Sequence, residues 1–65
     1  MTLLLNGEPR EVEATTLEQA LAELGYAGKV VATAVNGDFV AVRHRDGVTL
    51  HDGDRVEVVA PMQGG

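Results

Sequence analysis

The feature that most limits the fold of this chain is that its 65 residues include no cysteine. A domain of this size buries only about 60% of the surface that its unfolded chain exposes, so small domains often need a disulfide or a metal. Neither a disulfide framework nor a cysteine-ligated zinc can form here, and two separated histidines do not replace them. We therefore expect a single domain, residues 1–65, stabilised by aliphatic packing alone.

Charge and hydropathy exclude several classes of function. The net charge of −5 disfavours nucleic-acid binding, which needs clustered Lys and Arg, and is better suited to a basic protein partner. No apolar run approaches the roughly 20 residues of a membrane span, and the start of the chain lacks the pattern of a signal peptide. We expect a cytoplasmic protein with no membrane contact and no cofactor bound in an enclosed pocket.

The first half of the chain predicts a hairpin and then a helix. Asn6-Gly7 separates two short extended runs, and Asn-Gly is a strong hairpin signal because both residues tolerate positive φ. Thr15 or Thr16 can cap a helix, with Glu18 or Gln19 closing a capping box. The helix carries an apolar stripe and ends at Gly25, followed by Tyr26 folding back; the stripe residues are Leu17, Ala20, Leu21 and Leu24.

The second half predicts four further extended segments. A buried strand covers residues 30–35, and Asn36-Gly37 leads into a second apolar stretch, residues 39–42. A charged loop at 43–46, a brief extended piece at 48–50 and a turn at 52–54 follow. The last strand, residues 55–59, alternates charged and apolar side chains.

This order of elements fits an α+β fold of the β-grasp type, with a mixed sheet of four to five strands and one main helix on one face. In that arrangement the first and last strands lie side by side and parallel near the sheet centre. Four residues then face the helix: Leu3, Leu5, Val56 and Val58. Leu4 and Val59 are expected to meet on the uncovered face, beside the exit of the C-terminal segment.

The C-terminal segment reads Ala60-Pro61-Met62-Gln63-Gly64-Gly65. Pro61 discourages strand pairing and the glycines have no side chain to pack, so we expect residues 60–65 to project as a flexible tail. A terminal glycine pair arises by chance in about 0.5% of chains of average composition. The pair therefore indicates that the exposed C-terminal segment has a function and is not merely an unstructured end.

Taken together, these motifs resemble the thiamin-biosynthesis sulfur carriers called ThiS, small ubiquitin-like β-grasp proteins. The resemblance covers the whole chain. It rests on Leu5-Asn6-Gly7, on Thr16-Leu17, on Val35-Asn36-Gly37, and most specifically on residues 52–59 leading into Gly64-Gly65. Such carriers often have Val-Pro-Arg after the middle strands, where this chain has Val40-Ala41-Val42-Arg43.

The resemblance implies that the chain is a co-substrate for other enzymes rather than an enzyme. An E1-like adenylating enzyme, which binds the ATP, would activate the Gly65 carboxylate. A sulfur donor protein would then convert the carboxylate to a thiocarboxylate, and thiazole synthase would take the sulfur. Gly64 and Gly65 form the reacting end, and residues 60–63 form the partner-binding segment.

Three other features of the sequence could carry a function. The side chains of His44, Asp46, His51, Asp52 and Asp54 match no zinc or EF-hand spacing, so we expect no metal site. Arg43-His44-Arg45 is expected to be a surface loop, with a partner contact left open. A docking patch is also left open, and its candidates are Leu4, Phe39, Arg43, Val59 and Met62.

Several functions remain as alternatives. Related Gly-Gly carriers supply sulfur to molybdopterin synthesis or tRNA thiolation, so the acceptor pathway stays open. A ubiquitin-like modifier conjugated to lysines and a plain structural subunit are the other classes. A thiocarboxylate, an isopeptide-linked ladder and neither product, respectively, would distinguish the three.

Overall fold

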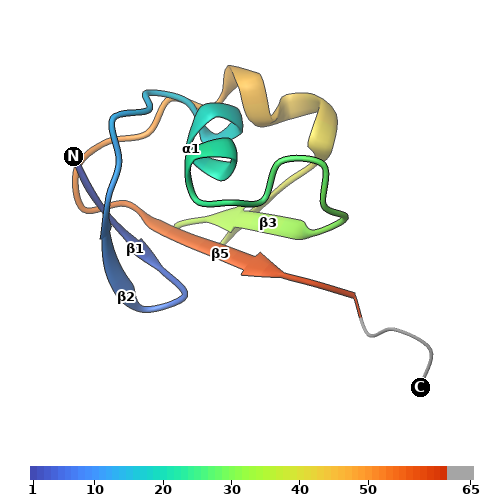
Figure 1. Ribbon diagram of the computed structural model, residues 1–65, viewed down its shortest axis with the longest axis horizontal. Coiled ribbons are helices and arrows are strands. Elements are labelled where there is room, and N and C mark those ends of the chain that lie inside the picture. Colours follow the sequence, from blue (N-terminus) through green and yellow to red (C-terminus); the bar gives the residue numbers. More distant parts are fainter. Residues whose placement is uncertain (62–65) are drawn as a thin grey trace.

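The computed structural model describes residues 1–61 as one sheet covered on one face by two short helices (Figure 1). The elements are β1 (Thr2–Leu5), β2 (Glu8–Glu11), α1 (Leu17–Glu23), β3 (Ala32–Val35), β4 (Asp38–Val40), the 3-10 helix η1 (Val42–Gly47) and β5 (Arg55–Val59). The strand order is β2-β1-β5-β3-β4, with β1 parallel to β5 and the other neighbours antiparallel. The predicted β-grasp arrangement is therefore confirmed.

Both hairpin turns form at the predicted Asn-Gly pairs. The φ angles are 49° and 87° at Asn6 and Gly7, and 51° and 88° at Asn36 and Gly37. Positive φ at both central residues defines the type I′ turn, whose twist matches that of the flanking strands. Pro9 lies in the edge strand β2, where its missing N–H leaves no ladder bond unmade.

The ends of α1 are fixed by the capping residues that the sequence predicts. The N–H of Gln19 donates to the side-chain oxygen of Thr16 at 3.3 Å, so Thr16 is the N-cap. At the other end Gly25 has φ of 95°, and the Tyr26 N–H donates back to the Leu21 carbonyl at 2.8 Å. This is the bond of a Schellman motif, and it stops the helix at the predicted glycine.

The core lies between the sheet and the two helices, which sit on the same side of it (Figure 1). Leu3 and Val56 are fully buried, and Leu5 and Val58 nearly so, as predicted for the helix-facing positions of β1 and β5. The remaining core residues are Val12, Ala14, Leu17, Ala20, Leu21, Val31, Val40 and Leu50. None of the helices in this part of the chain could cross a bilayer.

Two strand predictions are wrong at their ends. β3 begins at Ala32 and not at Val30, because Ala32–Val59 is the last pair with β5 and Val30 lies beyond it. Val30 is accordingly 80% exposed instead of buried. Of the second apolar stretch, residues 39–42, only Phe39 and Val40 belong to β4, and Val42 is the first residue of η1.

The predicted surface loop at residues 43–46 is also wrong in two respects. The segment forms most of η1, which packs against α1. Arg45 is buried within it, at 7% exposure, while Arg43 and His44 remain exposed. The run of three cationic residue types predicted a uniformly solvated segment, but one turn of helix directs the third of them into the protein.

Candidate functional site

The C-terminal segment follows directly from β5, which has a neighbouring strand on each side. The Leu4 N–H donates to the Asp54 carbonyl and the Asn6 N–H to the Val56 carbonyl, each at 2.9 Å. On the other side, four successive residue pairs join β5 to β3 and end at Ala32–Val59. The strand that precedes the Gly-Gly pair in the sequence is thus held along its whole length.

The two Asn-Gly turns also hold β5 through their side chains. The Asn6 amide nitrogen donates to the Val58 carbonyl at 3.1 Å, and the Val58 N–H donates to the Asn6 amide oxygen at 2.9 Å. Asn36 acts near the start of the strand, accepting from the Arg55 N–H at 3.0 Å and donating to the Asp54 carboxylate at 3.1 Å. Sequence reasoning predicted the turns and missed these contacts.

A signal for them is present in the sequence. Asp-Gly forms the same type I′ turn as Asn-Gly, yet both turns carry Asn. Of these two residues, only Asn offers both a donor and an acceptor, because an ionised Asp carboxylate only accepts, and pairing with a peptide group requires both. Two Asn-Gly turns flanking one central strand could therefore have suggested side-chain pairing with it.

Only the first two residues of the C-terminal segment belong to the described structure. Ala60 and Pro61 are exposed and lie outside β5. Met62, Gln63, Gly64 and Gly65 fall outside the described residues, so the predictions placed on them stay predictions. The part of the candidate site that the structure describes is therefore the surface where the segment leaves the sheet.

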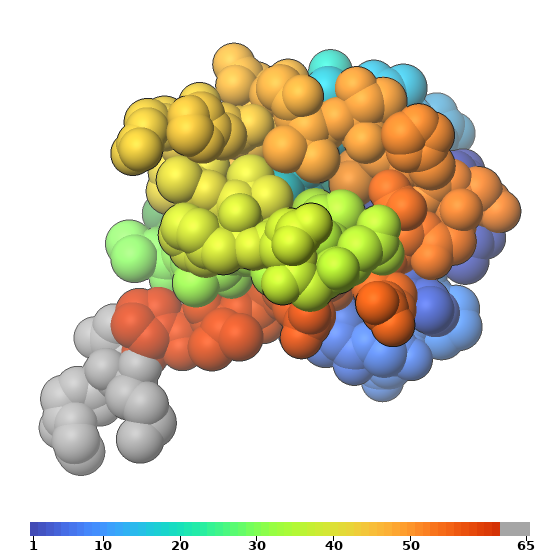
Figure 2. Space-filling view, turned by 180° about the vertical axis from the view of Figure 1, so that it is seen from behind, coloured from blue at the N-terminus to red at the C-terminus, as the bar shows by residue number. Residues whose placement is uncertain are grey.

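An apolar surface lies at this point, and we call it the tail-base patch: Val30, Ala32, Val59 and Pro61. These residues line a shallow pocket of about 270 Å³. Val30 is 80% and Val59 63% exposed. In Figure 2 the red end of β5 lies below the green residues that precede β3, in agreement with the Ala32–Val59 pair.

The predicted docking patch is only partly brought together. Phe39, 74% exposed, pairs with Ala34 and shares the open sheet face with Val59. Leu4 instead pairs with Arg55, four residues before Val59, a separation of roughly 13 Å along the strand. The expectation that Leu4 and Val59 meet is therefore wrong.

Arg43 is also separated from the docking face. It belongs to η1, which lies with α1 on the covered side of the sheet, whereas Val59 faces the open side (Figure 1). The alternation of side chains along a strand could not reveal this, because Arg43 lies beyond the end of β4.

The histidines and aspartates do not gather into a metal site. Within residues 1–61 no group of three or more His, Asp or Glu side chains could hold an ion. His51 and Asp54 do lie together, 3.8 Å apart, at the turn before β5. Hydrogen bonds from the Asn36 side chain and the His51 N–H hold the pKa of Asp54 below its ordinary value.

A family model, a related protein and a solved structure that match this chain all carry the name ThiS. The model of the family described as the ThiS family matches residues 3–65. The sulfur carrier protein ThiS of Thermus thermophilus is 50% identical over 62 residues, covering 94% of this chain and 95% of that protein. The crystal structure of the thiamine biosynthesis protein ThiS from Geobacter metallireducens superposes with a TM-score of 0.83 at 32% identity, and the match covers both chains completely.

A second kind of relative is much longer than this chain. A thiazole synthase of Paramagnetospirillum magneticum is 39% identical over 66 residues, and one of Magnetococcus marinus is 42% identical over the same length. Each match covers 100% of this chain but only 20% of the synthase. These two synthases therefore contain a region similar to this entire chain.

Proposed function

The chain belongs to the ThiS family, and we propose that it carries sulfur for thiamine biosynthesis as a thiocarboxylate on Gly65. The strongest support is the place of Gly64 and Gly65 in the sequence, five and six residues after the last residue of β5. β5 is a central strand that its neighbours fix on both sides. Six residues span at most roughly 20 Å. That reach lets the body of the protein dock outside an active site while Gly65 enters it.

The chemistry requires an activating partner, because a carboxylate is a poor acyl donor. In the proposed first step, a Gly65 carboxylate oxygen attacks the α-phosphate of ATP on an E1-like enzyme, and pyrophosphate leaves. A hydrosulfide ion delivered by a sulfur donor protein then attacks the acyl carbon, a C–S bond forms, and the C–O bond to AMP breaks. Loss of the remaining S–H proton leaves the thiocarboxylate. ATP and its metal ion are bound by the partner in this proposal.

Glycine suits these steps for a steric reason. The acyl carbon must approach a phosphate inside the partner's active site, and a Cβ at residue 64 or 65 would restrict both the approach and the accessible φ and ψ angles. The tail-base patch would contact the partner beside the channel. Contiguous exposed apolar side chains often mark protein–protein interaction sites.

Thiazole synthase is the acceptor that the relatives favour. Two thiazole synthases contain a region similar to the whole of this chain within a single polypeptide. Joining two proteins in one polypeptide raises their effective concentration, which is useful when they act together. This supports thiazole formation over molybdopterin synthesis or tRNA thiolation as the destination of the sulfur.

Intact-mass spectrometry tests the proposal. The protein is incubated with the activating enzyme, ATP and a sulfur donor, and we expect the mass change of one sulfur replacing one oxygen. A variant with one alanine added after Gly65 should lose this product while keeping its fold, and one with an alanine added before Met1 is the matched control. Normal exchange in the C-terminally extended variant would overturn the proposal.

A further inference from the structure

A second pocket lies on the covered side of the sheet. It is formed by α1, the loop after it and η1, and its volume is about 270 Å³. Three charged residues line it: Glu18, Lys29 and Arg45. The sulfur-carrier chemistry uses none of them.

Arg45 is unusual because it is buried and has no counter-ion among residues 1–61. Its side chain is held by two uncharged acceptors: Nε donates to the Thr33 hydroxyl at 3.0 Å and Nη2 to the Val31 carbonyl at 2.6 Å. Among residues 1–61, no Asp or Glu carboxylate lies within 4.0 Å of the Arg45 guanidinium. Burying an uncompensated charge is costly, so buried guanidinium groups normally pair with an anion.

One part of the Arg45 guanidinium makes no hydrogen bond with residues 1–61. Nη1 makes no hydrogen bond with the described residues, whereas Nε and Nη2 both do. In this part of the chain no fully buried side-chain polar atom lacks a partner, so Nη1 must be accessible. Because Arg45 lines the pocket, an anion bound there would lie beside its side chain, and the planar donor group of a guanidinium suits an oxyanion.

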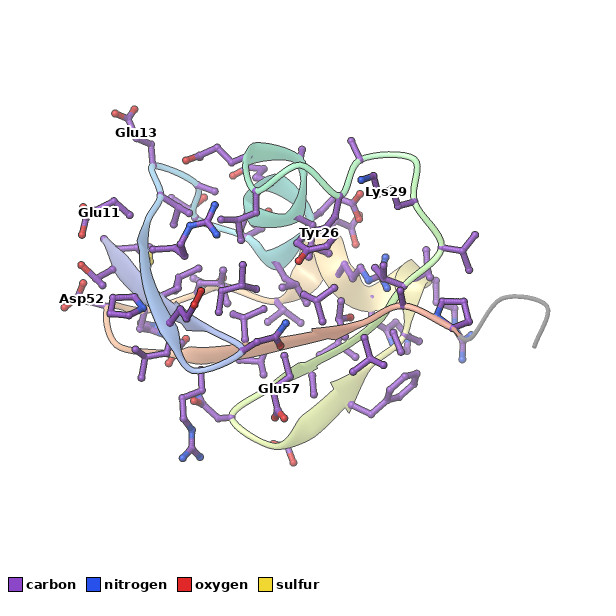
Figure 3. All side chains as sticks on the ribbon, turned by 60° about the horizontal axis from the view of Figure 1, so that its bottom comes forward. Glu11, Glu13, Tyr26, Lys29, Asp52 and Glu57 are labelled. Atoms are coloured by element: carbon purple, nitrogen blue, oxygen red, sulfur yellow. The ribbon has the colours of Figure 1, made fainter. Side chains whose placement is uncertain are left out.

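Lys29 adds a second positive charge to the same pocket. It is exposed and lies at the end of the molecule opposite to Glu11, Glu13 and Asp52, as Figure 3 shows. With Arg45 and Lys29 positive and Glu18 negative, the lining carries a net charge of +1 on a protein whose total is −5. The pocket is therefore a local exception to the acidity of the chain.

We propose that this pocket binds an oxyanion between Arg45 and Lys29. The ligand is either a free anion such as sulfate or phosphate, or the carboxylate of an acidic side chain on a partner protein. Lys29 directly precedes Val30 of the tail-base patch, so a partner that covers the patch would bring its own side chains close to the pocket. The anion site itself does not depend on the chemistry of Gly65.

Titration of the isolated, ¹⁵N-labelled protein with sodium sulfate tests the site, with sodium chloride at equal ionic strength as reference. We expect saturable NMR shifts of the Arg45 Nε–H and the Lys29 amide. Lys29→Gln should weaken sulfate binding about threefold to tenfold, and Glu18→Gln should tighten it by a similar factor. The matched controls are Arg10→Gln and Glu8→Gln, which remove the same charges from exposed positions on β2.

Non-saturating shifts, or equal sulfate affinity in Lys29→Gln and Arg10→Gln, would overturn the proposal. Measuring the affinity of the protein for the activating enzyme and for thiazole synthase shows whether the anion is free or belongs to a partner. A partner carboxylate predicts that sulfate weakens binding of the parent protein more than binding of Lys29→Gln. A free anion predicts equal partner affinity for both. Because the titration involves neither ATP nor Gly65, failure of the sulfur-carrier proposal would leave its result unchanged.

Discussion

The side chain of Asn6 pairs with the backbone of Val58 through two hydrogen bonds, across 52 positions of sequence. It continues the parallel ladder that the Asn6 N–H makes with the Val56 carbonyl. The amide thus takes the place of one more peptide group after β1 has ended. As a result β5 is supported on this side to the residue before its last, close to where the C-terminal segment begins.

Replacing Asn6 with Asp tests this contact while keeping the turn, because Asp-Gly also suits type I′. The change removes the donor to the Val58 carbonyl and sets a carboxylate oxygen against it. We expect the free energy of unfolding to fall by about 1–3 kcal/mol near neutral pH. Urea denaturation measures this value, and a variant as stable as the parent would show that the side-chain pairing contributes nothing.

The contact between Asn36 and Asp54 predicts a pH-dependent stability. The Asn36 side chain is the largest cause that lowers the pKa of Asp54 in the folded protein. A lowered folded pKa stabilises the protein above the unfolded value, about pH 4, and this contribution is lost as the pH falls through the folded pKa.

Asn36→Gly keeps the positive φ of the turn and removes this hydrogen bond together with the one from the Arg55 N–H, which does not depend on the charge of Asp54. We expect a loss of about 1 kcal/mol near neutral pH and a smaller loss at a pH below the folded pKa, where the Asp54 carboxyl is protonated. Thermal or urea unfolding at both pH values measures the difference. A loss that is the same at both would mean that the ionised carboxylate is not involved.

The sequence was sufficient for the architecture because its turn and cap residues act locally. Asn-Gly pairs set the two hairpins, Thr16 and Gly25 set the helix ends, and alternation in β5 identified its buried face. The failures lie where a strand ends. Whether Val30 is paired depends on where its partner strand stops, and no local pattern of Val30 to Val35 contains that information.

The sequence did not predict that Arg45 is buried, and mutation can test the structural role of its side chain. Arg45→Met keeps much of the side-chain volume and removes the hydrogen bonds to Val31 and Thr33. We expect a loss of about 1–3 kcal/mol in unfolding free energy, since the Val31 carbonyl then lacks this buried donor. Arg43→Met, two residues earlier and exposed, is the control and should change stability by less than about 0.5 kcal/mol. Equal effects would refute the structural role of Arg45.

The tail-base patch predicts which apolar residues matter for docking. Val30→Asp and Val59→Asp should weaken binding to the activating enzyme about tenfold or more, because each sets a charge on the apolar contact. Thr49→Asp is the matched control, since Thr49 is exposed and lies in the segment after η1. Calorimetry or surface plasmon resonance measures the affinities. Equal weakening by all three changes would indicate a general charge effect and no docking patch.

The candidate site was less predictable than the fold. Alternation in residues 55–59 predicts that Val59 faces the uncovered side of the sheet, and the structure confirms that placement. The docking role of Val59 and Phe39 stays a prediction. Leu4 was wrongly grouped with Val59, since two strands can be adjacent and parallel while their register separates given residues. The parallel pairing was predictable from the order of elements, but the register depends on packing across the whole sheet.

The central claim is that sulfur is carried on the terminal acyl group of Gly65, and fragmentation mass spectrometry of the product tests it most directly. After reaction with the activating enzyme, ATP and sulfur donor, the account predicts that the added sulfur appears only in fragments that contain Gly65. Sulfur located in any fragment that lacks Gly65, or no sulfur in the product at all, would contradict it.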